Sequence, residues 1–155
     1  MNQYTFNKIT KDSEIPYELL LLADETKEAI DQYIFKSDIY LLLDEAQSIA
    51  VMALYKNSDT ELEIKNVAVI ESYRSKGIGS ILMNKAKEIA KENHYEILSV
   101  GTSDTGFQQI RFYERNGFIK TGIRKDFFIE NYPFPIYENG LQMKDMVLLT
   151  HHLTE

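Results

Sequence analysis

The chain has 155 residues with a formal charge of −7, and 44% of its residues are apolar. This length and apolar content predict a single domain spanning residues 1–155, while the negative charge argues against a nucleic-acid partner, because phosphate backbones are bound by basic surfaces. The lack of cysteine excludes disulfide bonds and a thiol nucleophile, and the absence of a signal-peptide pattern or a long apolar run predicts a cytoplasmic protein that binds no membrane.

The N-terminal third is predicted to hold one strand and two helical segments. Residues 4–9 fit a strand, and Pro16 stands early in a helix that we expect to reach Ala23, where the missing N–H of proline costs little. A second helical segment is expected from Glu25 to Tyr33. Apolar side chains on such helices usually pack into a core, so most of them are assigned to it.

Three antiparallel strands are predicted next, at residues 38–43, 48–55 and 61–69, because these apolar runs are separated by polar turns at 44–47 and 57–60. In the third strand, alternation predicts that Leu62, Ile64 and Asn66 share one face. Glu63 and Lys65 would then share the other face. Only one of these faces can line a cleft.

A glycine-containing turn and a long helix follow the third strand. Gly77 and Gly79 lie where a Cβ would keep the phosphates of a ligand away from the backbone. Apolar residues at three- and four-residue spacing from Ile78 to Ala90 predict a helix that packs on the sheet, and the free N–H groups at its start favour an anion. Leu82 stands where a P-loop or a dinucleotide fingerprint needs a small residue, which excludes both motifs. A turn that binds nothing is the alternative.

The C-terminal half continues with a strand at 95–100, which the connecting helix should leave parallel to the strand at 61–69. A loop at 101–106 leads into a helix at 107–116, which Gly117 ends. A strand at 118–125, a long aromatic and acidic loop at 126–140 and a final strand at 142–149 are expected to follow. His151 and His152 are expected in a solvated tail rather than in a metal site.

Two motifs resemble those of one superfamily. Residues 74–79 read Arg-x-x-Gly-x-Gly, and residues 112–118 read Phe-Tyr-x-x-x-Gly-Phe. Together they resemble the acetyl-CoA pyrophosphate turn and a downstream helix of the GNAT superfamily of N-acetyltransferases. The resemblance implies an α/β acyl-CoA N-acyltransferase fold, with a mixed, mostly antiparallel sheet, a splayed parallel strand pair and helices on both faces. It also implies acetyl-CoA as the cosubstrate and no metal.

The resemblance further implies roles for individual residues. Glu63, eleven residues before Arg74, corresponds to a general base for the attacking amine; the alternative is a solvated strand carboxylate paired with Lys65. Tyr113 corresponds to the acid that protonates the departing thiolate; the alternative is a tyrosine packed at a sheet edge. The residues expected to contact acetyl-CoA are Val67, Val69, Arg74, Ser75, Lys76, Gly77, Ile78, Gly79, Ser80 and Asp104. Asp104 stands where relatives often have Asn, and an ionised carboxylate only accepts hydrogen bonds, which leaves its contact open.

The acceptor is expected between the loop at 126–140 and the segment around Tyr33. The residues expected to contact it are Tyr33, Phe127, Phe128, Glu130 and Tyr132, as an aromatic wall with a carboxylate that attracts an ammonium group. The alternative is a loop that packs its own aromatic side chains or forms a homodimer contact.

The sequence therefore predicts direct acetyl transfer from acetyl-CoA to a primary amine, without a covalent enzyme intermediate. A small polyamine or aminoglycoside and a peptide or protein amine are both open as acceptors, because a fold does not fix a substrate. A non-catalytic acyl-CoA sensor or partner-binding module is the alternative from another class.

Overall fold

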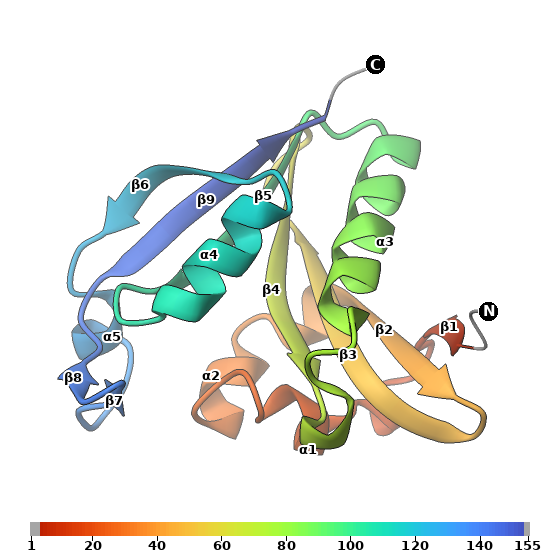
Figure 1. Ribbon diagram of the computed structural model, residues 1–155, viewed down its shortest axis with the longest axis horizontal. Coiled ribbons are helices and arrows are strands. Elements are labelled where there is room, and N and C mark those ends of the chain that lie inside the picture. The colour runs from red at the N-terminus through yellow and green to blue at the C-terminus, as the bar shows by residue number, and fades with distance from the viewer. Residues whose placement is uncertain (1–3, 154–155) are drawn as a thin grey trace.

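The computed structural model describes residues 4–153, and within them the chain forms a seven-stranded sheet with helices on both faces (Figure 1). The strand order is β1-β2-β3-β4-β5-β9-β6, and β7 and β8 form a separate hairpin. The strands are β1 (Tyr4–Lys8), β2 (Ser37–Asp44), β3 (Gln47–Lys56), β4 (Glu61–Val69), β5 (Ile97–Ser103), β6 (Ile119–Arg124), β7 (Tyr137–Glu138), β8 (Leu141–Gln142) and β9 (Met146–His152). The helices are α1 (Tyr17–Leu20), α2 (Lys27–Asp31), α3 (Ile78–Glu92), α4 (Phe107–Arg115) and α5 (Phe127–Glu130), with 3-10 turns η1 (Asp12–Glu14), η2 (Ile34–Lys36) and η3 (Glu71–Tyr73).

The sheet is antiparallel except at its centre. There β4 and β5 run parallel, through residue pairs that begin at Glu61–Ile97 and end at Ile64–Val100. All other neighbouring strands of this sheet are antiparallel. Figure 1 shows the two halves of the sheet meeting where β4 and β5 pair and opening apart below that point. The predicted fold class is therefore confirmed, including the parallel pair.

Two apolar clusters hold the helices to the sheet. The side chains of α3 that reach the first cluster are Ile78, Leu82, Met83, Ala86 and Ala90, each no more than 1% exposed. They are the three- and four-residue stripe that the sequence predicts for this helix. On the opposite face, Leu20 of α1 and Ile30 of α2 pack in a second cluster with Val51 of β3. Among residues 4–153, no helix is long and apolar enough to cross a membrane.

A β-bulge in β4 changes which side chains face α1 and α2. The register with β3 skips Lys65, and an extra residue in one strand disturbs the alternation of faces. Asn66 therefore lies on the face of Glu63, where its amide nitrogen donates to the carbonyl of Leu20, at 3.0 Å. The expected grouping of Asn66 with Ile64 was wrong, because strict alternation does not continue through a bulge.

Four expectations for the C-terminal half were also wrong in detail. β5 extends to Ser103, so half of the expected loop at 101–106 is strand. β9 begins at Met146 and includes His151, because its residues pair with β5 on one side and β6 on the other. His151 is not in a solvated tail: its Nδ1 lies 2.9 Å from the carbonyl oxygen of Gly117. The loop at 126–140 contains α5 and leads into the β7-β8 hairpin.

Candidate functional site

The parallel strands separate at one point and leave a strand edge open. Pairing between β4 and β5 ends at Ile64 and Val100, and from there β4 continues beside β3 while β5 continues beside β9. Within the described chain, the β5-facing edge of residues 65–69 has no strand partner. An extended ligand with amide groups can add to such an edge. We call the opening between residues 65–69 and residues 101–103 the fork.

At the open end of β4, the chain forms a cradle of backbone amides. Ser75 and Gly77 have positive φ angles of 63° and 79°. Gly77 precedes α3 without a side-chain cap, so the amides of Ile78, Gly79 and Ser80 have no acceptor within the helix. A Cβ on Gly77 would meet no atom within 4 Å. The free amides and the helix dipole favour an anion, and the space beside Gly77 can admit one.

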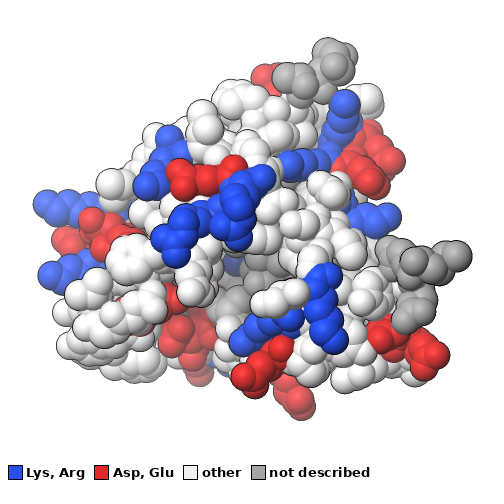
Figure 2. Space-filling view, in the orientation of Figure 1, with Lys and Arg blue, Asp and Glu red and all other residues white. Residues whose placement is uncertain are grey.

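Basic side chains surround this cradle. The Nε atom of Arg74 donates to the carbonyl oxygen of Val69 at 2.9 Å, which ties the turn to the end of β4. The Nζ atom of Lys76 lies 5.2 Å from the centre of the Tyr73 ring. Figure 2 shows Lys and Arg side chains over this turn and over α4, on either side of a hollow in this face. Their charge adds to the preference of the cradle for an anion.

Glycine is required at position 79 for a different structural reason than at position 77. A Cβ on Gly79 would lie 2.9 Å from Cζ of Phe112, closer than side chains tolerate. Gly79 thus allows the start of α3 to pack against the Phe112 ring of α4, rather than making room for a phosphate. This contact fixes α4 next to the cradle.

Tyr113 follows Phe112 on α4 and is 6% exposed. Its ring packs edge-on against Phe112 and Phe118, with centroid distances of 5.3 and 5.8 Å. Burial raises the pKa of Tyr113 well above its ordinary value, so the hydroxyl keeps its proton. Among residues 4–153 this hydroxyl has no hydrogen-bond partner. A protonated hydroxyl without a partner among these residues is suited to donate to a ligand atom.

Glu63 lies on the α2 side of β4 and is 5% exposed. Its Oε1 atom accepts from Nδ2 of Asn57 at 2.8 Å and lies 3.3 Å from Nζ of Lys65. The expected pairing with Lys65 is present, but the carboxylate is buried rather than solvated. Because Glu63 stands one residue before the last β4–β5 pair, it lies just behind the fork.

A hydrogen-bonded chain joins three separate segments on the α2 side of the fork. Asn66 donates to the hydroxyl oxygen of Tyr33 at 3.0 Å, and that hydroxyl donates to Asp24 at 3.1 Å. The hydroxyl of Tyr132, from the C-terminal loop, donates to the other carboxylate oxygen of Asp24 at 2.6 Å. Burial and the nearby Asp24 raise the pKa of both tyrosines, which keeps them protonated as donors. Sequence reasoning found Tyr33 and Tyr132 and missed Asp24, which has no local signal.

The other expected site residues are more dispersed. Phe127 packs on Phe128, which is 8% exposed and forms a small cluster with Ile136 and Met143. The loop therefore packs its own aromatic surface, and this includes the Tyr132 ring, which stacks on Phe128 at 5.9 Å between centroids while its hydroxyl reaches Asp24. Glu130 ends α5 and is exposed. The carboxylate of Asp104 accepts from the backbone N–H of Lys144 at 3.2 Å, so it binds the C-terminal loop.

Glu25 offers a stability test of this acidic region. Burial, together with the charges of Asp24 and Glu138, raises the pKa of Glu25 above its ordinary value. The folded protein therefore carries a penalty that is full above the raised pKa and absent below the ordinary one. We expect Glu25→Gln to raise Tm by about 1–2 °C at pH 7 and to leave it unchanged near pH 3. Thermal unfolding at both pH values measures this, and an equal shift at both would contradict it.

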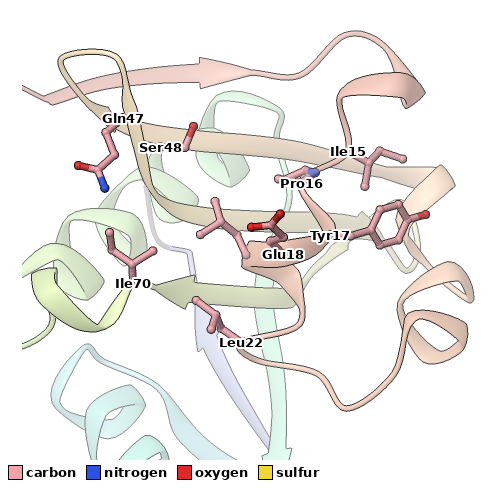
Figure 3. Close-up of a pocket in the computed structure, with 9 residues that line it drawn as sticks. Ile15, Pro16, Tyr17, Glu18, Leu22, Gln47, Ser48 and Ile70 are labelled. Atoms are coloured by element: carbon pink, nitrogen blue, oxygen red, sulfur yellow. The ribbon is translucent and has the colours of Figure 1, made fainter.

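A separate open groove of about 670 Å³ lies between α1 and the start of β3. Figure 3 shows Gln47, Ser48 and Ile70 on its sheet side and Ile15, Pro16 and Leu22 on the side of the N-terminal segment. It includes neither the cradle nor Tyr113, so it is distinct from the fork. In the part of the chain that the structure describes, no three His, Asp or Glu side chains are arranged to hold a metal ion.

Comparison with known proteins agrees with this geometry. The model of the acetyltransferase (GNAT) family matches residues 6–118. YvbK, an uncharacterized N-acetyltransferase of Bacillus subtilis (strain 168), is 37% identical over 133 residues, which cover 86% of each chain. A crystal structure of a GNAT family acetyltransferase from Elizabethkingia anophelis with acetyl-CoA bound has a TM-score of 0.95 and 41% identity, over 99% of this chain and 100% of that one. An IAA acetyltransferase from Bacillus cereus ATCC 14579 has a TM-score of 0.91 and 33% identity, over 97% and 99% of the two chains.

Proposed function

The chain belongs to the GNAT family of acetyltransferases, and we propose that it transfers the acetyl group of acetyl-CoA directly to a primary amine of a small molecule. Its membership of the family makes it an acetyl-CoA-dependent enzyme rather than the non-catalytic sensor that the sequence left open. The proposal concerns the acceptor and the residues that act on it.

One observation supports the proposal most directly. The contact between Gly79 and Phe112 brings the amide cradle at the start of α3 next to the helix that carries Tyr113. In the proposed complex the cradle holds the pyrophosphate, and the open edge at Val67 and Val69 pairs with the pantetheine amides. The acetyl group would then lie in the fork, within reach of the Tyr113 hydroxyl.

The proposed step forms one bond and breaks one. The amine nitrogen bonds to the acetyl carbonyl carbon, and the carbon–sulfur bond breaks. An alkyl ammonium has a pKa of about 10.4 and must first lose a proton; we assign that proton to Glu63 through a bound water, since its carboxylate is only 5% exposed. The backbone N–H of Val67 donates to the developing oxyanion. The nitrogen loses its second proton to solvent as the carbon–sulfur bond breaks. Tyr113 gives its proton to the thiolate sulfur and regains one from solvent.

Release of free CoA in the presence of a panel of small amines tests the proposal. The panel should contain aliphatic monoamines, diamines, aminoglycosides and lysine-containing peptides, with acetyl-CoA alone as the blank. Turnover with small amines and not with peptides is the expected outcome. Faster turnover of the peptides would contradict the assignment of a small-molecule acceptor.

Glu63→Gln separates the role of Glu63 as a base from its role in the local hydrogen-bond network. We expect kcat/KM near pH 7 to fall about 100-fold, the lower range for loss of a general base. Glu61→Gln is the matched control, because Asn57 donates to both carboxylates, at 2.9 Å to Glu61 and 2.8 Å to Glu63. An equal loss in both variants would assign Glu63 a structural role only. A pH–rate profile should show that the Glu63→Gln rate follows the ionisation of the amine itself.

A further inference from the structure

Two acidic residues of the N-terminal segment lie at the fork without a cation. Asp24 is held there by the hydroxyl of Tyr33, at 3.1 Å, and by that of Tyr132, at 2.6 Å. Both donors are neutral, so the charge of Asp24 is not compensated. Glu25 follows directly, and its backbone N–H donates to Asp24 at 2.7 Å. Through Tyr33 and Asn66 this pair is attached to β4, on one side of the fork.

A third carboxylate is attached to the other side. Thr105, two residues after the end of β5, donates from its hydroxyl to Glu138 at 3.0 Å. Asn139 donates to the carbonyl of Thr105 at 2.9 Å, which fixes the β7-β8 hairpin there. We call Asp24, Glu25 and Glu138 the acidic trio. Figure 2 shows acidic side chains between α2 and this hairpin, on the face that carries the hollow.

Within the part of the chain that the structure describes, the acidic trio has no positive partner. None of the ion pairs formed among residues 4–153 includes a member of the trio. Burial raises the pKa of Glu25, and the neighbouring charges of Asp24 and Glu138 raise it further. Like charges held close together destabilise one another until a cation binds between them.

At the base of the fork, a buried side-chain oxygen of Asn66 also lacks a hydrogen-bond partner among the described residues. Asn66 is 4% exposed, and its Oδ1 atom is buried without a hydrogen-bond donor from residues 4–153. Its amide nitrogen donates to Leu20 and to Tyr33, so the side chain is fixed with this nitrogen, and not Oδ1, toward the Tyr33–Asp24 pair. Asn66 stands two residues beyond the last β4–β5 pair. A buried acceptor without a donor is unfavourable, which indicates that a ligand N–H completes it.

We propose that the acceptor is a small aliphatic diamine or polyamine. This inference rests on the proposed acetylation of an amine. Its reacting amino group donates to Oδ1 of Asn66 at the base of the fork. Its second ammonium group lies between the carboxylates of the acidic trio and supplies the positive charge that residues 4–153 do not. The same trio disfavours an acceptor whose second group is an anion.

Binding measurements with matched amines test this without requiring turnover. Calorimetric titration of the protein–CoA complex with putrescine and with n-butylamine compares acceptors that differ by one ammonium group. We expect putrescine to bind about tenfold or more tightly, as charge-assisted hydrogen bonds indicate, and γ-aminobutyrate to bind least well. Glu25→Gln and Glu138→Gln should each reduce the preference for putrescine and leave the affinity for n-butylamine unchanged. Glu92→Gln, on the exposed C-terminal turn of α3, removes the same charge and should change neither affinity.

Asn66→Ala gives a second, different signature. Because Oδ1 would bind the amino group that both amines share, this variant should weaken putrescine and n-butylamine by the same factor, with Tm recorded to confirm folding. Equal affinities of the wild-type protein for the two amines would overturn the inference, and so would an effect of Glu92→Gln as large as that of Glu138→Gln. Turnover of amines without a diamine preference would leave the proposed function standing. A diamine preference in binding without turnover of any amine would remove the proposed function and retain the acidic trio as a binding site.

Discussion

Tyr113→Phe should lower kcat about 100-fold or more, within the range for loss of a general acid, while the Kd for acetyl-CoA stays the same. The change removes only the hydroxyl, which has no hydrogen-bond partner among residues 4–153, so the packing of the ring on Phe112 and Phe118 is kept. The loss should therefore affect departure of the thiolate and not the fold. Steady-state kinetics and equilibrium binding of acetyl-CoA provide the two measurements.

Tyr40→Phe is the matched control for this experiment. Tyr40 is also buried, at 9% exposed, and its ring stacks on Phe6 at 5.0 Å, on β2 and away from the fork. We expect this variant to retain full kcat. Because burial raises the pKa of Tyr113, ionisation of its hydroxyl should not reduce kcat/KM below about pH 10, the ordinary tyrosine value. A decline below that pH that disappears in Tyr113→Phe would contradict its role as a buried, protonated acid.

Alanine at each of the two glycines of the turn should produce different defects. In Gly79→Ala, the new Cβ would lie 2.9 Å from Cζ of Phe112, so α3 or α4 must shift. We expect a loss of stability of about 1–3 kcal/mol, as for an overpacked core, and a fall in kcat because Tyr113 follows Phe112. In Gly77→Ala the Cβ meets no protein atom. There we expect a cost of about 1 kcal/mol from the positive φ and a Kd for CoA raised about tenfold.

Denaturant unfolding and CoA titration of the two variants separate stability from affinity. Adding Phe112→Leu to Gly79→Ala should recover part of the lost stability, because the smaller side chain relieves the contact. A double-mutant cycle measures this coupling. If Gly79→Ala weakened CoA binding and left stability unchanged, the packing role assigned to Gly79 would be incorrect.

Local patterns were sufficient for much of the fold. The stripe from Ile78 to Ala90 repeats at helical spacing, and the structure buries it on the sheet as α3. The polar turn at 44–47 and the strands on both sides of it are likewise visible in sequence order. These features depend on residues close together in the chain, where periodicity and turn composition carry direct physical information.

The features that local patterns missed depend on distant contacts. The β4 bulge places Asn66 on the face of Glu63, and the residue types at that position do not predict a bulge. The hydrogen bond from Tyr132 to Asp24 joins positions 108 residues apart. The start of β9 was placed too early because residues 142–149 also read as a strand, and only pairing with β5 and β6 selects Met146.

The position of β9 also orders the folding of this protein. β9 lies between β5 and β6, both of which precede it in the chain, so each of them exposes an unpaired edge until β9 inserts. Pairings between residues this far apart in sequence form slowly, and open edges can join those of other molecules. The segment that carries Tyr132 and Glu138 connects β6 to β9. Insertion of one strand therefore both covers the facing edges of β5 and β6 and delivers the side chains of the proposed acceptor region.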